Sequence, residues 1–174
     1  ENTAALLKVH PSNFRIEGFT HTPDIAELTQ IARKHRILVF HDIGSGCLFE
    51  TEKYGLTHEP MPQDSLEKGA DLVLFSGDKL LGGPQSGIIV GKAEIIELLE
   101  NHPMYRALRV DKMNLAALSA TLLYYMKGEA DTKLPVWQMI LESETNLKQR
   151  AKKWSQAIGT KASVIQGLST IGGG

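Results

Sequence analysis

The chain has 174 residues, 42% of them hydrophobic and 22% charged, which is the balance of an ordinary soluble globular protein. Its formal net charge of −1 excludes the global basic field that nucleic-acid-binding proteins display, so we expect no DNA partner. A single cysteine, Cys47, excludes an internal disulfide framework, and no apolar run is long enough to cross a membrane. We therefore expect a cytoplasmic protein without a membrane partner.

Three short apolar runs alternate with helical patterns, and they cover residues 5–9, 37–40 and 71–75. Thr22, Pro23 and Asp24 are typical of a helix start, with a capping hydroxyl and proline in the first helical position. Residues 64–67 resemble a capping box with Asp64 as the cap. This alternation of strands and helices implies an α/β fold with a mostly parallel sheet covered on both faces.

Polar residues follow each of the three predicted strands, at Ser12-Asn13, at His41-Asp42 and from Ser76 to Lys79. In parallel sheets the ligands sit at the carboxyl ends of the strands. The coincidence of these residues with the strand ends is the first indication of a functional site.

A further strand is predicted over residues 86–90, directly after a glycine-rich turn. It follows the third strand too closely for a helical crossover, so we expect it to be antiparallel. Two helices are predicted next, over residues 93–101 and 114–127, the second stopped by Gly128.

The remaining sequence indicates a second domain. We expect residues 1–127 to form one domain, residues 128–135 a linker, and residues 136–174 the beginning of the next domain, opened by one long helix that Gly159 closes. Trp137 and Trp154 are predicted to lie in its core. Both ends of the sequence look cut, so we expect an interior piece of a longer protein.

Lys79 is the residue best placed for chemistry. It follows a strand end, with Ser76 before it and a glycine-rich turn after it, so its amine can face a cleft and act as a nucleophile toward an aldehyde. Ser76 and the amide of Gly77 can bind a phosphate nearby. Asp42, at the end of the preceding strand in the sequence, can pair with a protonated pyridine nitrogen. The alternative for Lys79 is an exposed lysine in a tight turn, which is the commonest setting for this residue type.

Four stretches resemble bacterial selenocysteine synthases, the L-seryl-tRNA selenium transferases, and they are residues 7–16, 42–46, 75–87 and 106–112. The longest of them, around Lys79, reads FSGDKLLGGPQSG. Two residues depart from the family pattern: an acid is expected in place of His41, and threonine in place of Pro11. His41 is expected to be packed rather than catalytic.

The resemblance implies the second half of an aspartate-aminotransferase-like, fold-type I large domain and the start of an α+β small domain. It implies pyridoxal 5′-phosphate held by Lys79 in a Schiff base, with Asp42, Ser76 and Gly77 also binding the cofactor. The implied reaction converts seryl-tRNA(Sec) to selenocysteinyl-tRNA(Sec) with selenophosphate, through a dehydroalanyl intermediate. The implied assembly is a homo-oligomeric ring of dimers, such as a decamer.

The resemblance also implies residues that bind the substrates. Arg106 and Arg109, three apart, would share one face of a helical turn and hold the selenophosphate, although a pair of solvated arginines is the alternative. Ser12 and Asn13 are further candidates for substrate binding. Asp78 would orient Lys79 or Arg109, or bond the backbone of the turn.

Two other functions remain open at this point. The first is a related pyridoxal-phosphate lyase of the ammonia-lyase type, acting on an amino acid or an amino sugar acid. The second is a non-catalytic tRNA- or protein-binding module on the same scaffold. The histidines show no metal-ligand spacing, so no metal site is predicted, and Cys47 is expected to be a small buried residue. The near-neutral charge suggests that most tRNA contacts lie outside this chain.

Overall fold

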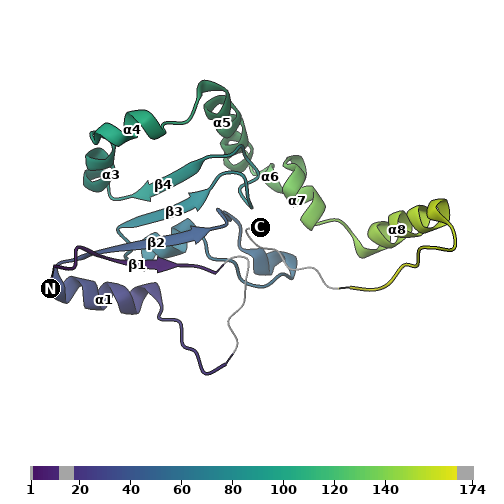
Figure 1. Cartoon of the computed structure of the whole chain (residues 1–174), viewed down its shortest axis with the longest axis horizontal. Coiled ribbons are helices and arrows are strands. Elements are labelled where there is room, and N and C mark those ends of the chain that lie inside the picture. The colour runs from purple at the N-terminus through teal and green to yellow at the C-terminus, as the bar shows by residue number, and fades with distance from the viewer. Residues whose placement is uncertain (1, 12–17, 168–174) are drawn as a thin grey trace.

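The computed structural model describes residues 2–11 and 18–167, so Ser12 and Asn13 lie outside the described residues. Its centre is a four-stranded sheet (Figure 1). The strands follow the chain in order: β1 (Ala5–Val9), β2 (Leu38–Gly44), β3 (Leu72–Ser76) and β4 (Gly87–Gly91). The first three are parallel and β4 is antiparallel to β3, as the sequence predicted.

Two helices connect the parallel strands, α1 (Ile25–His35) and α2 (Pro62–Glu67). The predicted start of α1 was wrong: Asp24 is the capping residue, and Glu27 completes a capping box with it. A carboxylate with a glutamate three residues later satisfies two backbone amides at once, which outweighs the hydroxyl of Thr22. The predicted capping box in α2 was also wrong, because the helix begins at Pro62 and Asp64 lies inside its first turn.

The sheet is covered on one face only within the described residues, not on both as predicted. The covered face carries Val39, Ile43 and Val73, which pack with Ile25 and Ala32 of α1 in the main core. On the opposite face, Leu7 is 62% and Val9 is 59% exposed. The register of β1 with β2 places Asp42 beside Val9, on this open face.

The chain continues beyond β4 into three helices that arch past the edge of the sheet (Figure 1): α3 (Ala93–Glu100), α4 (Pro103–Leu108) and α5 (Lys112–Met126). Asp111 caps α5 by accepting from the amides of Met113 and Asn114. Gly128 adopts a φ of 68° just after α5, which glycine tolerates, and it ends the helix as predicted.

The single long helix predicted after Pro135 is two helices, α7 (Pro135–Ile140) and α8 (Glu144–Ile158), and Gly159 does close the second. The break occurs because Ser143 caps α8 with its side chain. A short helix, α6 (Ala130–Lys133), occupies the segment predicted as a linker.

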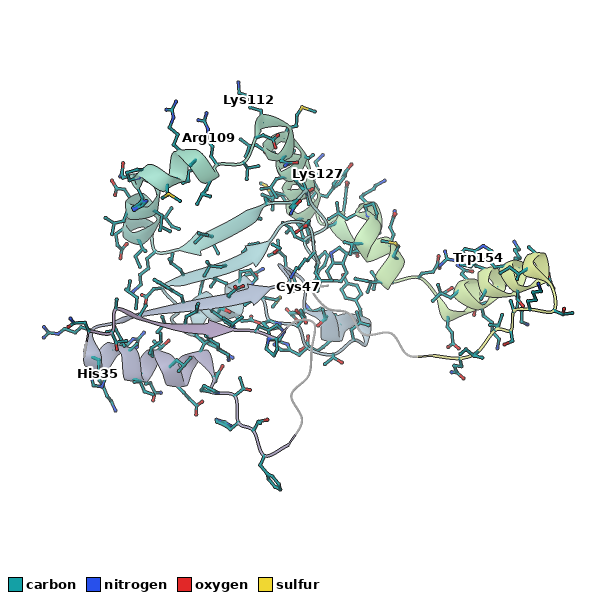
Figure 2. All side chains as sticks on the ribbon, viewed as in Figure 1. His35, Cys47, Arg109, Lys112, Lys127 and Trp154 are labelled. Atoms are coloured by element: carbon teal, nitrogen blue, oxygen red, sulfur yellow. The ribbon has the colours of Figure 1, made fainter. Side chains whose placement is uncertain are left out.

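The segment from α6 to α7 packs against the segments that follow β2 and β3. Trp137 and Ala130 are fully buried in one cluster with Cys47 and Leu80, so Trp137 packs with residues of the predicted first domain. Trp154 is 63% exposed on α8, which projects away from the sheet (Figure 2). The division into domains at residues 128–135 stays a prediction.

Candidate functional site

Asp42 lies inside a strand rather than after one, because β2 runs on to Gly44. Pairing with β1 and β3 on either side extends the strand past its apolar residues. The side chain is half-buried, and one of its oxygens accepts the amide of Gly44 at 3.0 Å. Its backbone carbonyl accepts the amide of His10 at 2.7 Å, so the residue is held on both sides.

Lys79 lies in the turn that joins β3 to β4. The turn is closed by backbone hydrogen bonds, including one of 3.0 Å from the amide of Gly82 to the carbonyl of Lys79. The side chain is half-buried, and its amine has no hydrogen bond or ion pair within residues 2–11 and 18–167. An amine in this position is available to a ligand.

A backbone contact joins the two candidate positions. The amide of Leu80 donates to the carbonyl of Ser45 at 2.8 Å. Leu80 follows Lys79, and Ser45 lies three residues after Asp42, directly beyond the end of β2. The ends of two neighbouring parallel strands are therefore connected, and their polar residues share one edge of the sheet.

The amide of Gly77, which was predicted to bind a phosphate, already has a backbone partner. That amide donates to the carbonyl of Ser86 at 2.8 Å, because the pairing of β3 with β4 continues one residue past the strands. Glycine is required here for packing: a Cβ would lie 2.2 Å from the Ser86 hydroxyl and 2.7 Å from the carbonyl of Pro84.

The two residues beside Gly77 differ in exposure. Ser76 is half-buried on the same face of the sheet as Asp42, and its hydroxyl makes no hydrogen bond to any described residue. Asp78 is exposed, and within the described chain its carboxylate contacts neither Lys79 nor Arg109. Ser76 therefore remains a candidate ligand for phosphate. No contact among the described residues supports the predicted role of Asp78 in orienting Lys79 or Arg109.

The prediction that Arg106 and Arg109 share a helical turn was wrong. Helix α4 ends at Leu108, and Arg109 is extended, because the chain must straighten before Asp111 caps α5. Both side chains are exposed, and neither pairs with a described carboxylate. Figure 2 shows Arg109 pointing outward on the far side of α4 from the sheet. The structure does not bring these arginines to the strand ends of the same chain.

His41 and Cys47 are both structural. His41 is 4% exposed, lies 2.9 Å from the Ser65 hydroxyl through Nδ1, and has a buried Nε2 without a partner among the described residues. This burial lowers its pKa to about 4, and the positive charge of Lys8 acts in the same direction. Burial raises the pKa of Cys47 to about 11, so its thiol is not a nucleophile near neutral pH, as predicted.

Two cavities open elsewhere on the described chain, and neither is lined by Lys79 or Asp42. The first, of about 300 Å³, is lined by Lys8, His41 and Lys68 among others. The second, of about 450 Å³, lies beside α1 and β2. The described residues also include no cluster of His, Cys, Asp or Glu suited to a metal ion. No described helix is both long and apolar enough to span a membrane.

Sequence reasoning missed three residues that shape the turn around Lys79. They are Ser45, through its carbonyl, and the paired side chains of Tyr125 and Trp137. Their hydrogen bonds join segments that are far apart in the sequence, and neither spacing nor composition indicates them.

The combination of a free amine and a carboxylate at adjacent strand ends can serve a cofactor that carries both an aldehyde and a basic ring nitrogen. Solved structures share the fold. A D-glucosaminate-6-phosphate ammonia-lyase matches 86% of this chain and 34% of its own at a TM-score of 0.59, with 22% identity. A PLP-dependent aminotransferase from Streptococcus suis matches 87% of this chain and 37% of its own at a TM-score of 0.50, with 15% identity.

The sequence comparisons are more specific. The family model SelA, L-seryl-tRNA selenium transferase, matches residues 1–174, so the chain belongs to that family. An L-seryl-tRNA(Sec) selenium transferase of Alkaliphilus oremlandii is 48% identical over 180 residues, covering 100% of this chain and 38% of the relative. The Shewanella oneidensis protein of that name is 48% identical over 172 residues, which cover 98% of this chain and 36% of that relative. The chain thus spans less than two fifths of the curated relatives it matches.

Proposed function

We propose that the protein to which this chain belongs is a pyridoxal-phosphate-dependent L-seryl-tRNA(Sec) selenium transferase. It would convert seryl-tRNA(Sec) to selenocysteinyl-tRNA(Sec) with selenophosphate as the selenium donor. The observation that carries the proposal is the junction of Lys79 and Asp42 at neighbouring strand ends, bridged by the hydrogen bond from Leu80 to Ser45. Family membership supports the choice of reaction.

The residues present fit pyridoxal phosphate. The amine of Lys79 has no partner among the described residues, the carboxylate of Asp42 is half-buried on the open face, and the hydroxyl of Ser76 is unpaired there. Lys79 would hold the cofactor covalently, Asp42 would hold its ring nitrogen in the protonated form, and Ser76 would bind its phosphate. The bound cofactor supplies an electron sink that makes the Cα proton of the seryl group acidic.

Lys79 would then act as the base. Its amine, when not engaged in holding the cofactor, would take the proton from Cα of the seryl group, and hydroxide or water would leave from Cβ. The selenium of selenophosphate would add to Cβ of the resulting dehydroalanyl group while Cα regains a proton, and water would cleave the Se–P bond and release phosphate. Arg106 and Arg109 would bind the phosphate part of selenophosphate through charge-assisted hydrogen bonds.

The assembly and the cellular setting are proposals on the same basis. Exposed apolar side chains on α4 and α5, including Leu108 at 73% and Met113 at 81%, support a homo-oligomer in which a second copy covers these helices. A ring of dimers, such as a decamer, would satisfy this. We propose a cytoplasmic enzyme, in keeping with its tRNA substrate, and a domain boundary near residues 128–135.

The full-length protein tests the proposal. Purified with pyridoxal phosphate, it should convert seryl-tRNA(Sec) to selenocysteinyl-tRNA(Sec) when selenophosphate is supplied. Borohydride reduction followed by peptide mapping should find the cofactor on Lys79. Lys79→Ala should lose both signals, whereas Lys127→Ala, at an exposed lysine, should keep them (Figure 2). Cofactor found on another lysine would overturn the assignment. Ammonia release from free amino acids, without selenium transfer, would favour a lyase.

A further inference from the structure

We propose that Tyr125 is a positioning residue that holds the turn carrying Lys79, and that Trp137 directs its hydrogen bond. This inference deepens the proposed function and rests on Lys79 being the cofactor lysine. It concerns three elements distant in sequence: the turn after β3, the end of α5, and α7.

The contacts form a directed chain. The indole Nε1 of Trp137 donates to the phenol oxygen of Tyr125 at 2.9 Å. The phenol donates in turn to the carbonyl of Leu81 at 2.9 Å, and it lies 3.3 Å from the carbonyl of Leu80. An indole nitrogen can only donate, so the phenol must accept from it, and its single proton is left for the backbone carbonyls.

The surroundings hold this chain in place. Trp137 and Leu81 are fully buried, and Leu80 is 3% exposed. The ring of Phe49 packs against both members of the pair, with centroids 5.2 Å from Tyr125 and 4.9 Å from Trp137. Burial also raises the pKa of Tyr125, so the phenol keeps the proton that it donates at neutral pH.

The peptide following Lys79 is thereby anchored on two sides. The amide of Leu80 is bound by the carbonyl of Ser45, and the carbonyls of Leu80 and Leu81 face the phenol. Of these anchors only the phenol is a side chain, so it is the one that a substitution can remove. Without it the turn gains freedom next to Lys79, and the amine spends less time in the direction that the reaction requires.

The test compares Tyr125→Phe with Tyr124→Phe in the full-length holoenzyme. Tyr124 is the adjacent residue on α5, is 36% exposed, and makes no hydrogen bond to any described residue through its hydroxyl. We expect Tyr125→Phe to lower kcat for selenium transfer about five- to tenfold, the effect of one lost hydrogen bond. The KM for seryl-tRNA(Sec) should change less than about twofold, because Tyr125 is proposed to act through the turn and not to contact the substrate. Tyr124→Phe should match the wild type.

Two readouts separate positioning from a merely structural role. The visible absorbance of the lysine-bound cofactor should titrate at a different pH in Tyr125→Phe, because the freer turn changes the position of the Lys79 nitrogen and therefore its surroundings. In the cofactor-free protein, hydrogen exchange at the amides of residues 80–83 should quicken more than in the rest of the sheet. Trp137→Phe, which keeps a ring but removes the donor, should change both readouts in the same direction and to a smaller extent.

The outcomes are distinguishable. If the wild-type enzyme carries no cofactor on Lys79, the proposed function fails before Tyr125 is tested. If the wild type is active and Tyr125→Phe only lowers the unfolding midpoint, with kcat, the absorbance titration and local exchange equal to those of Tyr124→Phe, the positioning role is refuted.

Discussion

The amide of Leu80 and the carbonyl of Ser45 lie 2.8 Å apart, and this hydrogen bond ties the turn after β3 to the segment after β2. Because Lys79 precedes Leu80 and Asp42 lies three residues before Ser45, one backbone contact sets the spacing of the two candidate catalytic positions. Both atoms of this bond belong to the backbone, so the side chains of Leu80 and Ser45 take no part in it.

Asp42→Asn should remove the negative charge of this side chain while keeping its size and its hydrogen bond to Gly44. Asparagine keeps an oxygen that can accept the amide of Gly44, now at 3.0 Å, so the free energy of unfolding should barely change. The negative charge that is proposed to hold the cofactor ring nitrogen protonated is lost, so removal of the Cα proton should slow about ten- to a hundredfold. Rapid-mixing measurement of water loss from seryl-tRNA(Sec) checks this. Asp131→Asn, at a half-buried carboxylate on α6, is the control, and equal rates in both variants would make Asp42 a structural residue.

Gly77→Ala should destabilise the protein, whereas Gly87→Ala should not. The new Cβ at Gly77 would lie 2.2 Å from the Ser86 hydroxyl, and the same group at Gly87 meets nothing within 4 Å. Overpacking of this kind costs roughly 1–3 kcal/mol, whereas alanine in open space changes stability by about 0.5 kcal/mol or less. Urea unfolding of the two variants measures the difference. Similar midpoints would show that the turn shifts to accommodate the methyl group.

His41 should make the fold sensitive to mild acid. The folded pKa is lowered to about 4 from an ordinary 6.5, so between these values the unfolded chain binds a proton that the folded chain does not. Stability from this residue is therefore full above about pH 6.5 and is lost as the pH falls toward 4, by up to roughly 3 kcal/mol.

Urea unfolding at about pH 7 and about pH 5 measures the effect of His41. His41→Gln should flatten the pH dependence, since glutamine does not titrate. His35→Gln, at an exposed histidine on α1 (Figure 2), should leave it unchanged. A pH dependence that persists undiminished in His41→Gln would assign the acid sensitivity to other groups.

The arginine pair should affect only one half of the reaction. Arg106→Ala or Arg109→Ala would remove the proposed charge-assisted contact to the phosphate of selenophosphate, worth roughly 1.5–3 kcal/mol, so selenium transfer should fall about ten- to a hundredfold. Loss of water from seryl-tRNA(Sec) should persist. Lysine at either position should rescue in part, because it lacks the two-pronged donor geometry.

Following both half-reactions separately tests the arginine prediction, with Lys112→Ala as the control at an exposed cation on α5 (Figure 2). Equal losses in both halves would indicate a structural role or a contact to another anionic group of the substrate. No loss in either half would leave the pair as solvated charges.

The sequence by itself determined the succession of the strands along the chain, their directions and the chemistry at their ends. Alternating apolar runs and helical patterns predicted parallel β1 to β3, and the short turn before β4 predicted its reversal. Parallel strands bring their carboxyl ends to one edge, so Asp42 and Lys79 could be placed at the same edge of the sheet without coordinates. These features are local, or follow from the topology that local patterns impose. The motif around Lys79 was specific enough to indicate the family that the comparison confirmed.

Only the tertiary structure decided which polar groups are already paired. The amide of Gly77 binds Ser86, the straightened chain at Arg109 follows from the cap of α5, and Trp137 joins the core beside Leu80. Each outcome depends on packing between elements. The clearest case is Tyr125, whose phenol reaches the carbonyl of Leu81 across 44 residues of sequence. Such hydrogen bonds form where the core brings a donor and an acceptor together out of water, and residue type and spacing along the chain do not specify that meeting.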